Sequence, residues 1–142
     1  MKRLLCIGLF IAAVLTMLAA DSHDSKALQG DWTPVKAELG GQPMPEVVLK
    51  TISLKLGDGT YAVLVGDKPD NGVFKVDSST MPKSMDVTGT DGPNKGKTFP
   101  AIYELEGETL RICYDLSGVK RPTEFKTVAG TKLYLVTYQR RK

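Results

Sequence analysis

The residues that most resemble a chemical motif in this chain stand in DGPNKGKTF, residues 91–99. Gly96, Lys97 and Thr98 match the end of a phosphate-binding P-loop, G-x-x-x-x-G-K-[ST]. The first glycine of that motif should occupy position 91, but Gly92 is one residue too close. The segment after Thr98 indicates a strand, whereas a P-loop opens onto a helix whose N-terminus faces the phosphates. We therefore interpret these residues as a solvated hairpin turn with its lysines outside.

Side chains for nucleophilic or metal chemistry are scarce. His23 is the single histidine and lies in a polar segment before the first expected strand, so no Ser-His or Cys-His pair is expected. His23 and Cys113 are too few for a zinc site, and we expect no metal and no cofactor. Carboxylates could still meet across strands as an acid–base pair, so a carboxylate-based enzyme is a minor alternative. The candidates are Asp86, Asp91, Glu104, Glu106, Glu108, Asp115 and Glu124.

The N-terminus has the layout of a secretory signal. Lys2 and Arg3 precede an apolar run over residues 4–18, and small residues end it at Ala20. The run of about 15 residues is short against the ~20 that span a bilayer, which favours a cleaved signal over a membrane anchor. We expect a signal peptide over 1–20, a polar leader over 21–27, and one domain over 28–142, exported to the periplasm or beyond.

The charge limits the classes of partner that the protein could bind, and the cysteine content limits its possible disulfides. The whole chain carries a formal charge of +3, and loss of Lys2 and Arg3 with the signal would bring it to about +1. We therefore expect no nucleic-acid partner and, after cleavage, no membrane. Cys113 would be the one cysteine left, so an intrachain disulfide is excluded. A buried side chain is the favoured interpretation, with an intermolecular bridge and a reactive thiol as alternatives.

The elements that must position these residues are short strands. Apolar residues recur with period two between Gly, Pro, Asp and Asn, and one helical turn is expected before Gly30. The alternation predicts three shared faces: Ile52/Leu54/Leu56, Tyr61/Val63/Val65 and Leu110/Ile112/Tyr114. Strands are expected at 32–39, 47–56, 60–66, 72–77, 84–89, 98–105, 109–116 and 132–139. Asp58-Gly59 and Asn71-Gly72 supply the left-handed backbone of tight turns. The pattern predicts an all-β protein, a single antiparallel up-and-down barrel of about eight strands.

The stretch LQGDWTPV, residues 28–35, carries a G-x-W signature. Gly30 allows a tight turn against Trp32, whose indole would plug one end of a small barrel. Arg140 or Arg141 from the last strand is placed to cover this ring through a cation–π contact. Pro34 in the same strand indicates an edge or a bulge.

The stretch RICYDLSGVKRPTEF, residues 111–125, ends a strand in a charged loop. Pro122 holds Arg121 in an extended backbone, where it could bind a carboxylate of a ligand or partner. The favoured interpretation is structural: an Arg121–Glu124 pair that tethers the loop, or Arg121 as the cover of Trp32.

LQGDWTPV, MPKSMDV, GPNKGKTFPAIYELEGETLRICY and GVKRPTEF, in this order, resemble a family of small exported domains that is abundant in planctomycete bacteria. The resemblance covers nearly all of the chain after the signal. It implies a compact β domain, similar to lipocalins in outline, and it brings no established activity. GPNKGKT would then be the turn motif of this family rather than a P-loop.

Two main functions follow as hypotheses. A non-enzymatic, lipocalin-like module would hold a small apolar or amphipathic ligand in the barrel mouth, with Tyr61, Tyr103 and Tyr114 as candidate pocket residues. A structural or protein-interaction domain would instead have a packed core and would use the 116–125 loop, with Arg121, as its working surface. A cavity larger than a few waters would discriminate between the two.

Overall fold

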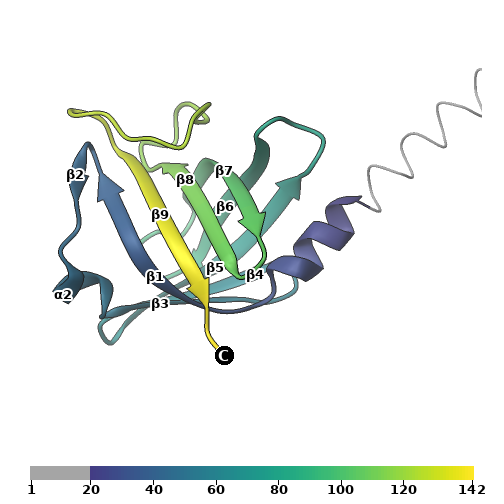
Figure 1. The fold of residues 1–142 in the computed structure, drawn as a ribbon, viewed down its shortest axis with the longest axis horizontal. Helices are drawn as coiled ribbons and strands as arrows, with labels where there is room; N and C mark the ends of the chain where they lie inside the picture. The colour runs from purple at the N-terminus through teal and green to yellow at the C-terminus, as the bar shows by residue number, and fades with distance from the viewer. Residues whose placement is uncertain (1–19) are drawn as a thin grey trace, which may run out of the picture.

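A computed structural model describes residues 20–142 as a closed antiparallel β-barrel (Figure 1). Its barrel strands are β1 Gly30–Leu39, β3 Ile52–Leu56, β4 Thr60–Val65, β5 Lys68–Asp77, β6 Lys83–Asp91, β7 Thr98–Glu106, β8 Thr109–Asp115 and β9 Leu133–Arg140. Each strand pairs with the next along the chain, and β9 returns to pair with β1 from Trp32↔Arg140 to Leu39↔Tyr134. The predicted all-β, up-and-down barrel of eight strands is confirmed.

Two-residue turns set the register of several hairpins. Gly107 follows β7 with φ +58°, and Gly66 follows β4 with φ +67°, conformations that favour glycine. Gly59 has the predicted left-handed backbone, at φ +70°. The prediction for Asn71-Gly72 is wrong: both residues lie inside β5, where the register shifts between them. Glycine is needed there because a Cβ on Gly72 would lie 2.5 Å from the Tyr61 ring.

The expected strand over 47–56 is also partly wrong. A short helix, α2 Glu46–Leu49, precedes β3, and a two-residue strand, β2 Gln42–Pro43, pairs with the end of β1. β1 pairs with β3 only through Gly30–Trp32, so the two strands separate beyond that point. Leu49 of α2 is buried and Met44 is partly buried against the core. The segment 42–49 therefore closes a gap between strands, which explains why its apolar residues do not continue the ladder.

Pro34 lies next to a break in the β1–β9 ladder, where the register shifts between Pro34 and Lys36. Proline has no N–H to donate to the ladder, and a bulge accommodates that loss. The predicted bulge is present, and the barrel nevertheless closes on both sides of it. Val35, the extra residue, is half exposed.

Inward-facing side chains form one core. The predicted faces Ile52/Leu54/Leu56, Tyr61/Val63/Val65 and Leu110/Ile112/Tyr114 point inward, because alternate residues of a strand share a face. On β9 the inward residues are Tyr134, Val136 and Tyr138. The predicted signal sequence lies outside the described residues, except for Ala20.

The segment expected to be a polar leader is helical through residue 28. Figure 1 shows this helical segment, residues 20–28, against one end of the barrel. Leu28 is fully buried, and the Asp24 carboxylate accepts hydrogen bonds from Lys83 Nζ and Tyr103 Oη, both at 2.7 Å. Asp21 accepts a bond from the Ser78 backbone N–H at 2.8 Å. The segment is therefore an integral part of the fold. Among residues 20–142, no helix is long and apolar enough to cross a bilayer.

Candidate ligand-binding cavity

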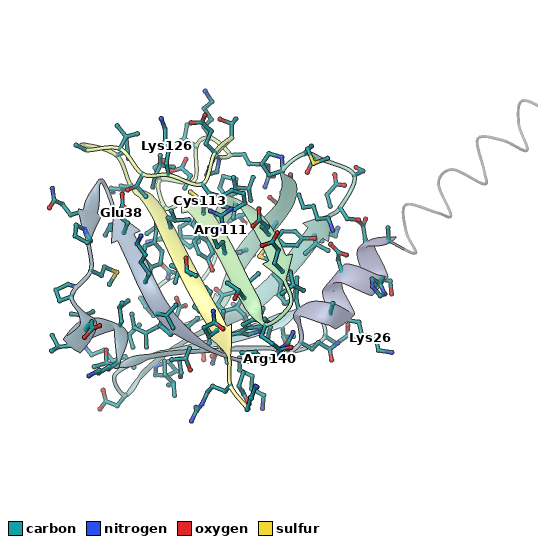
Figure 2. All side chains as sticks on the ribbon, in the orientation of Figure 1. Lys26, Glu38, Arg111, Cys113, Lys126 and Arg140 are labelled. Carbon is teal, nitrogen blue, oxygen red and sulfur yellow. The ribbon has the colours of Figure 1, made fainter. Side chains whose placement is uncertain are left out.

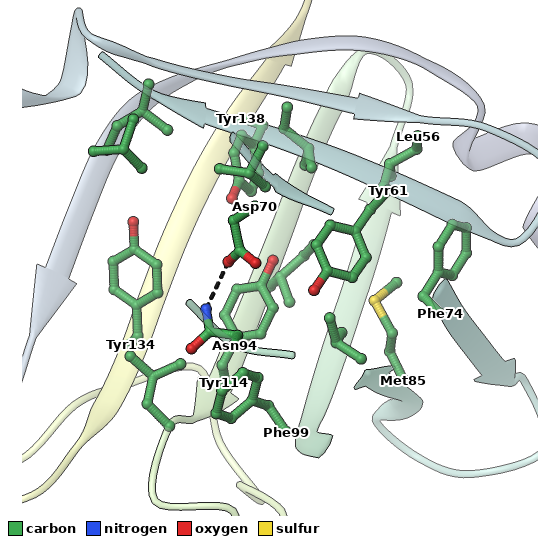
Figure 3. A pocket seen from close by; sticks show the side chains of 17 residues that line it. Leu56, Tyr61, Asp70, Phe74, Met85, Asn94, Phe99, Tyr114, Tyr134 and Tyr138 are labelled. Atoms are coloured by element: carbon green, nitrogen blue, oxygen red, sulfur yellow. Dashed lines mark hydrogen bonds between the residues drawn. The ribbon is translucent and has the colours of Figure 1, made fainter. Parts of the chain in front are cut away.

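The barrel contains a cavity of about 210 Å³. Every barrel strand except β1 contributes to its wall, together with two connecting segments (Figure 3). The wall consists of Ile52, Leu54, Leu56, Tyr61, Val63, Val65, Asp70, Phe74, Met85, Val87, Asn94, Phe99, Ile112, Tyr114, Leu116, Tyr134 and Tyr138. Val65 is 48% exposed, so the cavity reaches the surface at the end of β4. An engineered apolar cavity of roughly 150 Å³ binds benzene, so this space exceeds a few waters.

The opposite end of the barrel is closed by the G-x-W signature. Trp32 is fully buried, and its Nε1 donates to the Leu28 carbonyl at 2.9 Å. Of the two arginines considered, Arg140 covers the ring, with its guanidinium carbon 4.3 Å from the ring centroid. Gly30 has φ +143°, and a Cβ there would lie 2.6 Å from Arg140 Nη1. The three signature residues thus close one end and do not reach the cavity.

The three candidate tyrosines divide between two places. Tyr61 and Tyr114 line the cavity. Tyr103 does not: it is 2% exposed and its hydroxyl is bound to Asp24 under the helical segment. Alternation along β7 correctly predicted an inward side chain, but it carried no information about which end of the barrel Tyr103 would occupy.

Arg121 lies outside the barrel, away from the cavity. Its Nη1 donates to the carbonyls of Met85 and Ala101 at 3.0 and 2.9 Å, and its Nη2 pairs with Asp86 at 2.6 Å. The expected partner Glu124 instead pairs with Lys126 at 3.4 Å. Arg121 therefore tethers its loop, as the structural interpretation held, but to Asp86, and it does not cover Trp32.

The loop that contains Arg121, residues 116–132 between β8 and β9, also covers Cys113. The thiol is free and fully buried on the outer face of β8, and its Sγ lies 3.7 Å from the Lys126 carbonyl (Figure 2). Burial raises the pKa of the Cys113 thiol. Next to it, the buried Asp115 accepts bonds from the hydroxyl and backbone N–H of Ser117 and from the backbone N–H of Lys120. Burial opposes ionisation of Asp115, but these hydrogen bonds outweigh it and lower the pKa of its carboxyl. Cys113 therefore packs beneath the loop, and Asp115 holds the start of the loop by hydrogen bonds.

Two polar cavity residues, Asp70 and Asn94, are absent from the sequence prediction. Asn94 Nδ2 donates to Asp70 Oδ2 at 2.6 Å (Figure 3). Asp70 precedes Gly72 and Phe74 by even steps on β5, so alternation from the buried Phe74 would have placed it inward. The expected strands end at residue 66 and resume at 72, so they leave Asp70 in a connection and conceal this alternation. Nothing local marks Asn94, since it reaches the cavity only through the turn after β6.

The turn that contains Asn94 belongs to the stretch over residues 91–99 that resembles a P-loop in sequence. β7 follows it directly, and Lys95 and Lys97 are exposed, as predicted for a solvated hairpin turn. Gly92 has φ +94° and Gly96 has φ +82°. A Cβ at Gly92 would lie 3.4 Å from Asp70 Oδ1, so the turn packs closely over this carboxylate.

Burial dominates the electrostatics of the tyrosines in the wall. It raises the pKa of Tyr61 to about 12, with a further contribution from the negative charge of Asp70. Burial also raises the pKa of Tyr114, Tyr134 and Tyr138. All four are neutral phenols at neutral pH and can donate or accept hydrogen bonds.

The described wall of this cavity offers no site for the minor alternative of a carboxylate-based enzyme. Asp70 is the one carboxylate among its described wall residues, so a two-carboxylate mechanism lacks its second group there. Several of the candidate carboxylates have structural partners instead: Asp86 with Arg121, Glu104 with Arg111, Glu108 with Arg140, and Glu124 with Lys126. Within residues 20–142, no group of three or more His, Cys, Asp or Glu side chains could hold a metal ion.

In comparisons with known proteins, no family model matched the chain, and no curated protein or solved structure matched it significantly.

Proposed function

We propose that this protein is a non-enzymatic binding module that holds a small apolar or amphipathic ligand in the open end of its barrel. The observation that carries this proposal is the 210 Å³ cavity with a wall that is apolar or aromatic except for Asp70 and Asn94. Binding sites for small molecules are typically apolar, with a few placed polar groups. The N-terminal sequence and the family resemblance support export of the protein. Such a module would then meet its ligand outside the cytoplasm.

The closed end of the barrel also favours ligand binding. Trp32 and the helical segment over residues 20–28 close one end of the barrel, and the cavity lies toward the other end, where Val65 is exposed. A protein-interaction function through Arg121 receives less support, because its guanidinium is already bound by Asp86 and two carbonyls.

A filled-cavity variant tests the proposal. Val63→Phe on β4 puts extra volume into the cavity, whereas Ala62→Phe puts the same ring on the exposed outer face of the same strand. Native mass spectrometry of each protein, recovered from its exported fraction, should show a small-molecule mass in the wild type and in Ala62→Phe. That mass should be absent from Val63→Phe.

A bare mass for a correctly folded wild type, with no small molecule in its organic extract, would contradict the proposal. Retention of the same small molecule by Val63→Phe would place binding elsewhere on the protein. Circular dichroism of both variants controls for loss of the fold.

A further inference from the structure

The described wall of the cavity carries one charged side chain and no opposite charge. Apart from Asp70 and Asn94, the wall residues are aliphatic or aromatic, and the described wall contains no Lys, Arg or His. Asp70 forms no ion pair with another described residue. An ionised carboxylate beside apolar surface is unfavourable unless a cation or several donors compensate it.

The hydrogen bonds of Asp70 are incomplete. Oδ2 accepts the 2.6 Å bond from Asn94, which also fixes the carboxylate to the 92–97 turn. Oδ1 is buried and has no hydrogen-bond partner among the described residues. It lies against Gly92, where an added Cβ would be 3.4 Å away. A carboxylate accepts about four hydrogen bonds, so Asp70 has unused capacity where this turn closes over the cavity.

Aromatic rings surround the same space. Tyr61, Phe74, Phe99, Tyr114, Tyr134 and Tyr138 all contribute to the wall. Ring faces attract cations, and this attraction adds to that of a carboxylate. Figure 3 shows the Asp70 carboxylate among these side chains. The negative charge of Asp70 also contributes to the raised pKa of Tyr61, so this one phenol of the wall lies within the electrostatic reach of the carboxylate.

Building on the proposed binding function, we propose that the ligand is a small amphipathic amine. Its ammonium group binds Asp70 beside the 92–97 turn, and its apolar body lies among the aromatic and aliphatic side chains. An amphiphile with a carboxylate head, such as a fatty acid, is disfavoured because that head would meet Asp70 with no cation in the described wall. The volume suits a ring with a short side chain, since roughly 150 Å³ accommodates benzene.

Three probes that share a phenyl ring test this assignment at pH 7: 2-phenylethylamine, 2-phenylethanol and phenylacetate. Their dissociation constants are measured by ligand-observed NMR titration of the full barrel domain. 2-Phenylethylamine should bind at least about tenfold more tightly than the other two. Asp70→Asn keeps an acceptor for Asn94 but removes the charge, so it should weaken amine binding about tenfold or more and leave 2-phenylethanol unchanged.

Asp67→Asn is the matched control, because Asp67 is exposed in the adjacent β4–β5 turn and does not line the cavity. It should leave all three constants unchanged. If phenylacetate or 2-phenylethanol binds as tightly as the amine, or if Asp70→Asn has no effect, the amine proposal fails and the binding function stands. If none of the three probes binds, both proposals fail.

Discussion

Arg140 covers the ring of Trp32 and at the same time caps the helical segment before it. Its Nη1 and Nη2 donate to the carbonyls of Gln29 and Ala27 at 2.6 and 2.9 Å, and Trp32 Nε1 donates to Leu28 between them. The last carbonyls of a helix have no partner inside it. One cation–π pair therefore closes the barrel and satisfies the end of the helix that seals it.

Replacing Arg140 by lysine should destabilise the protein. A lysine keeps the charge but cannot form the planar stack and the forked hydrogen bonds together. We expect the free energy of unfolding to fall by about 1–3 kcal/mol, measured by urea denaturation followed by Trp32 fluorescence. Arg141→Lys is the control and should change it by less than about 0.5 kcal/mol. Equal effects of the two variants would contradict a specific role of Arg140.

Gly30 should tolerate no side chain. With φ +143° and Arg140 Nη1 only 2.6 Å from an added Cβ, Gly30→Ala strains the backbone and displaces the guanidinium from Trp32. We expect a loss of about 2–3 kcal/mol in the free energy of unfolding, measured by urea denaturation. Gly130→Ala is the comparison: φ is +79° but nothing lies within 4 Å, so only the backbone preference of about 1 kcal/mol is lost. A loss at Gly30 no larger than that at Gly130 would exclude the steric contribution.

The attachment of the helical segment should depend on pH through Asp24. Burial opposes its ionisation, but hydrogen bonds from Lys83 and Tyr103 outweigh burial and lower the pKa of Asp24 below its usual 3.8. A lowered folded pKa stabilises the protein above the unfolded pKa, and this stabilisation is lost as pH falls through the folded value.

Asp24→Asn should therefore lower the free energy of unfolding by about 1–2 kcal/mol at pH 7. The difference in the free energy of unfolding between Asp24→Asn and the wild type should become smaller as the pH falls below about 4. Urea denaturation across this range checks the trend, with Asp31→Asn, at an exposed position on β1, as control. A difference that is constant with pH would rule out the charge of Asp24 as its cause.

The Arg121 tether should control access to Cys113. Without the bonds to Asp86, Met85 and Ala101, the loop over residues 116–132 loses its attachment to β6 and β7. Arg121→Ala should raise the rate of Cys113 labelling by a thiol reagent about tenfold or more, because local opening limits reaction of a buried thiol. Lys120→Ala removes an exposed side chain from the same loop and should leave the rate unchanged. An unchanged rate in Arg121→Ala would mean that the other attachments of the loop, the hydrogen bonds of Asp115 and Thr127, hold it over Cys113 without Arg121.

The sequence patterns predicted the barrel well because strand alternation, turns and bulges depend on residues that are close together in the sequence. Period-two alternation placed Ile52, Leu54 and Leu56 on the inner face, since neighbouring side chains of a strand point to opposite faces. The short turn at Gly107 and the bulge beside Pro34 follow equally from the backbone preferences of single residues. The same patterns predicted a strand where α2 forms, because the apolar run 47–49 fits either element once its packing is unknown.

The sequence by itself determined the strand order, the inner faces and the residues that plug one end. Only the tertiary structure decided which inward residues surround empty space and which are packed. Tyr61 and Tyr103 both point inward, yet one lines the cavity and the other contacts Asp24, which is 79 positions away. Asp70 and Asn94 are 24 residues apart and Arg121 and Asp86 are 35 apart. Such pairs arise from barrel closure and leave no periodic signal, because a hydrogen bond between distant residues constrains only two positions in the sequence.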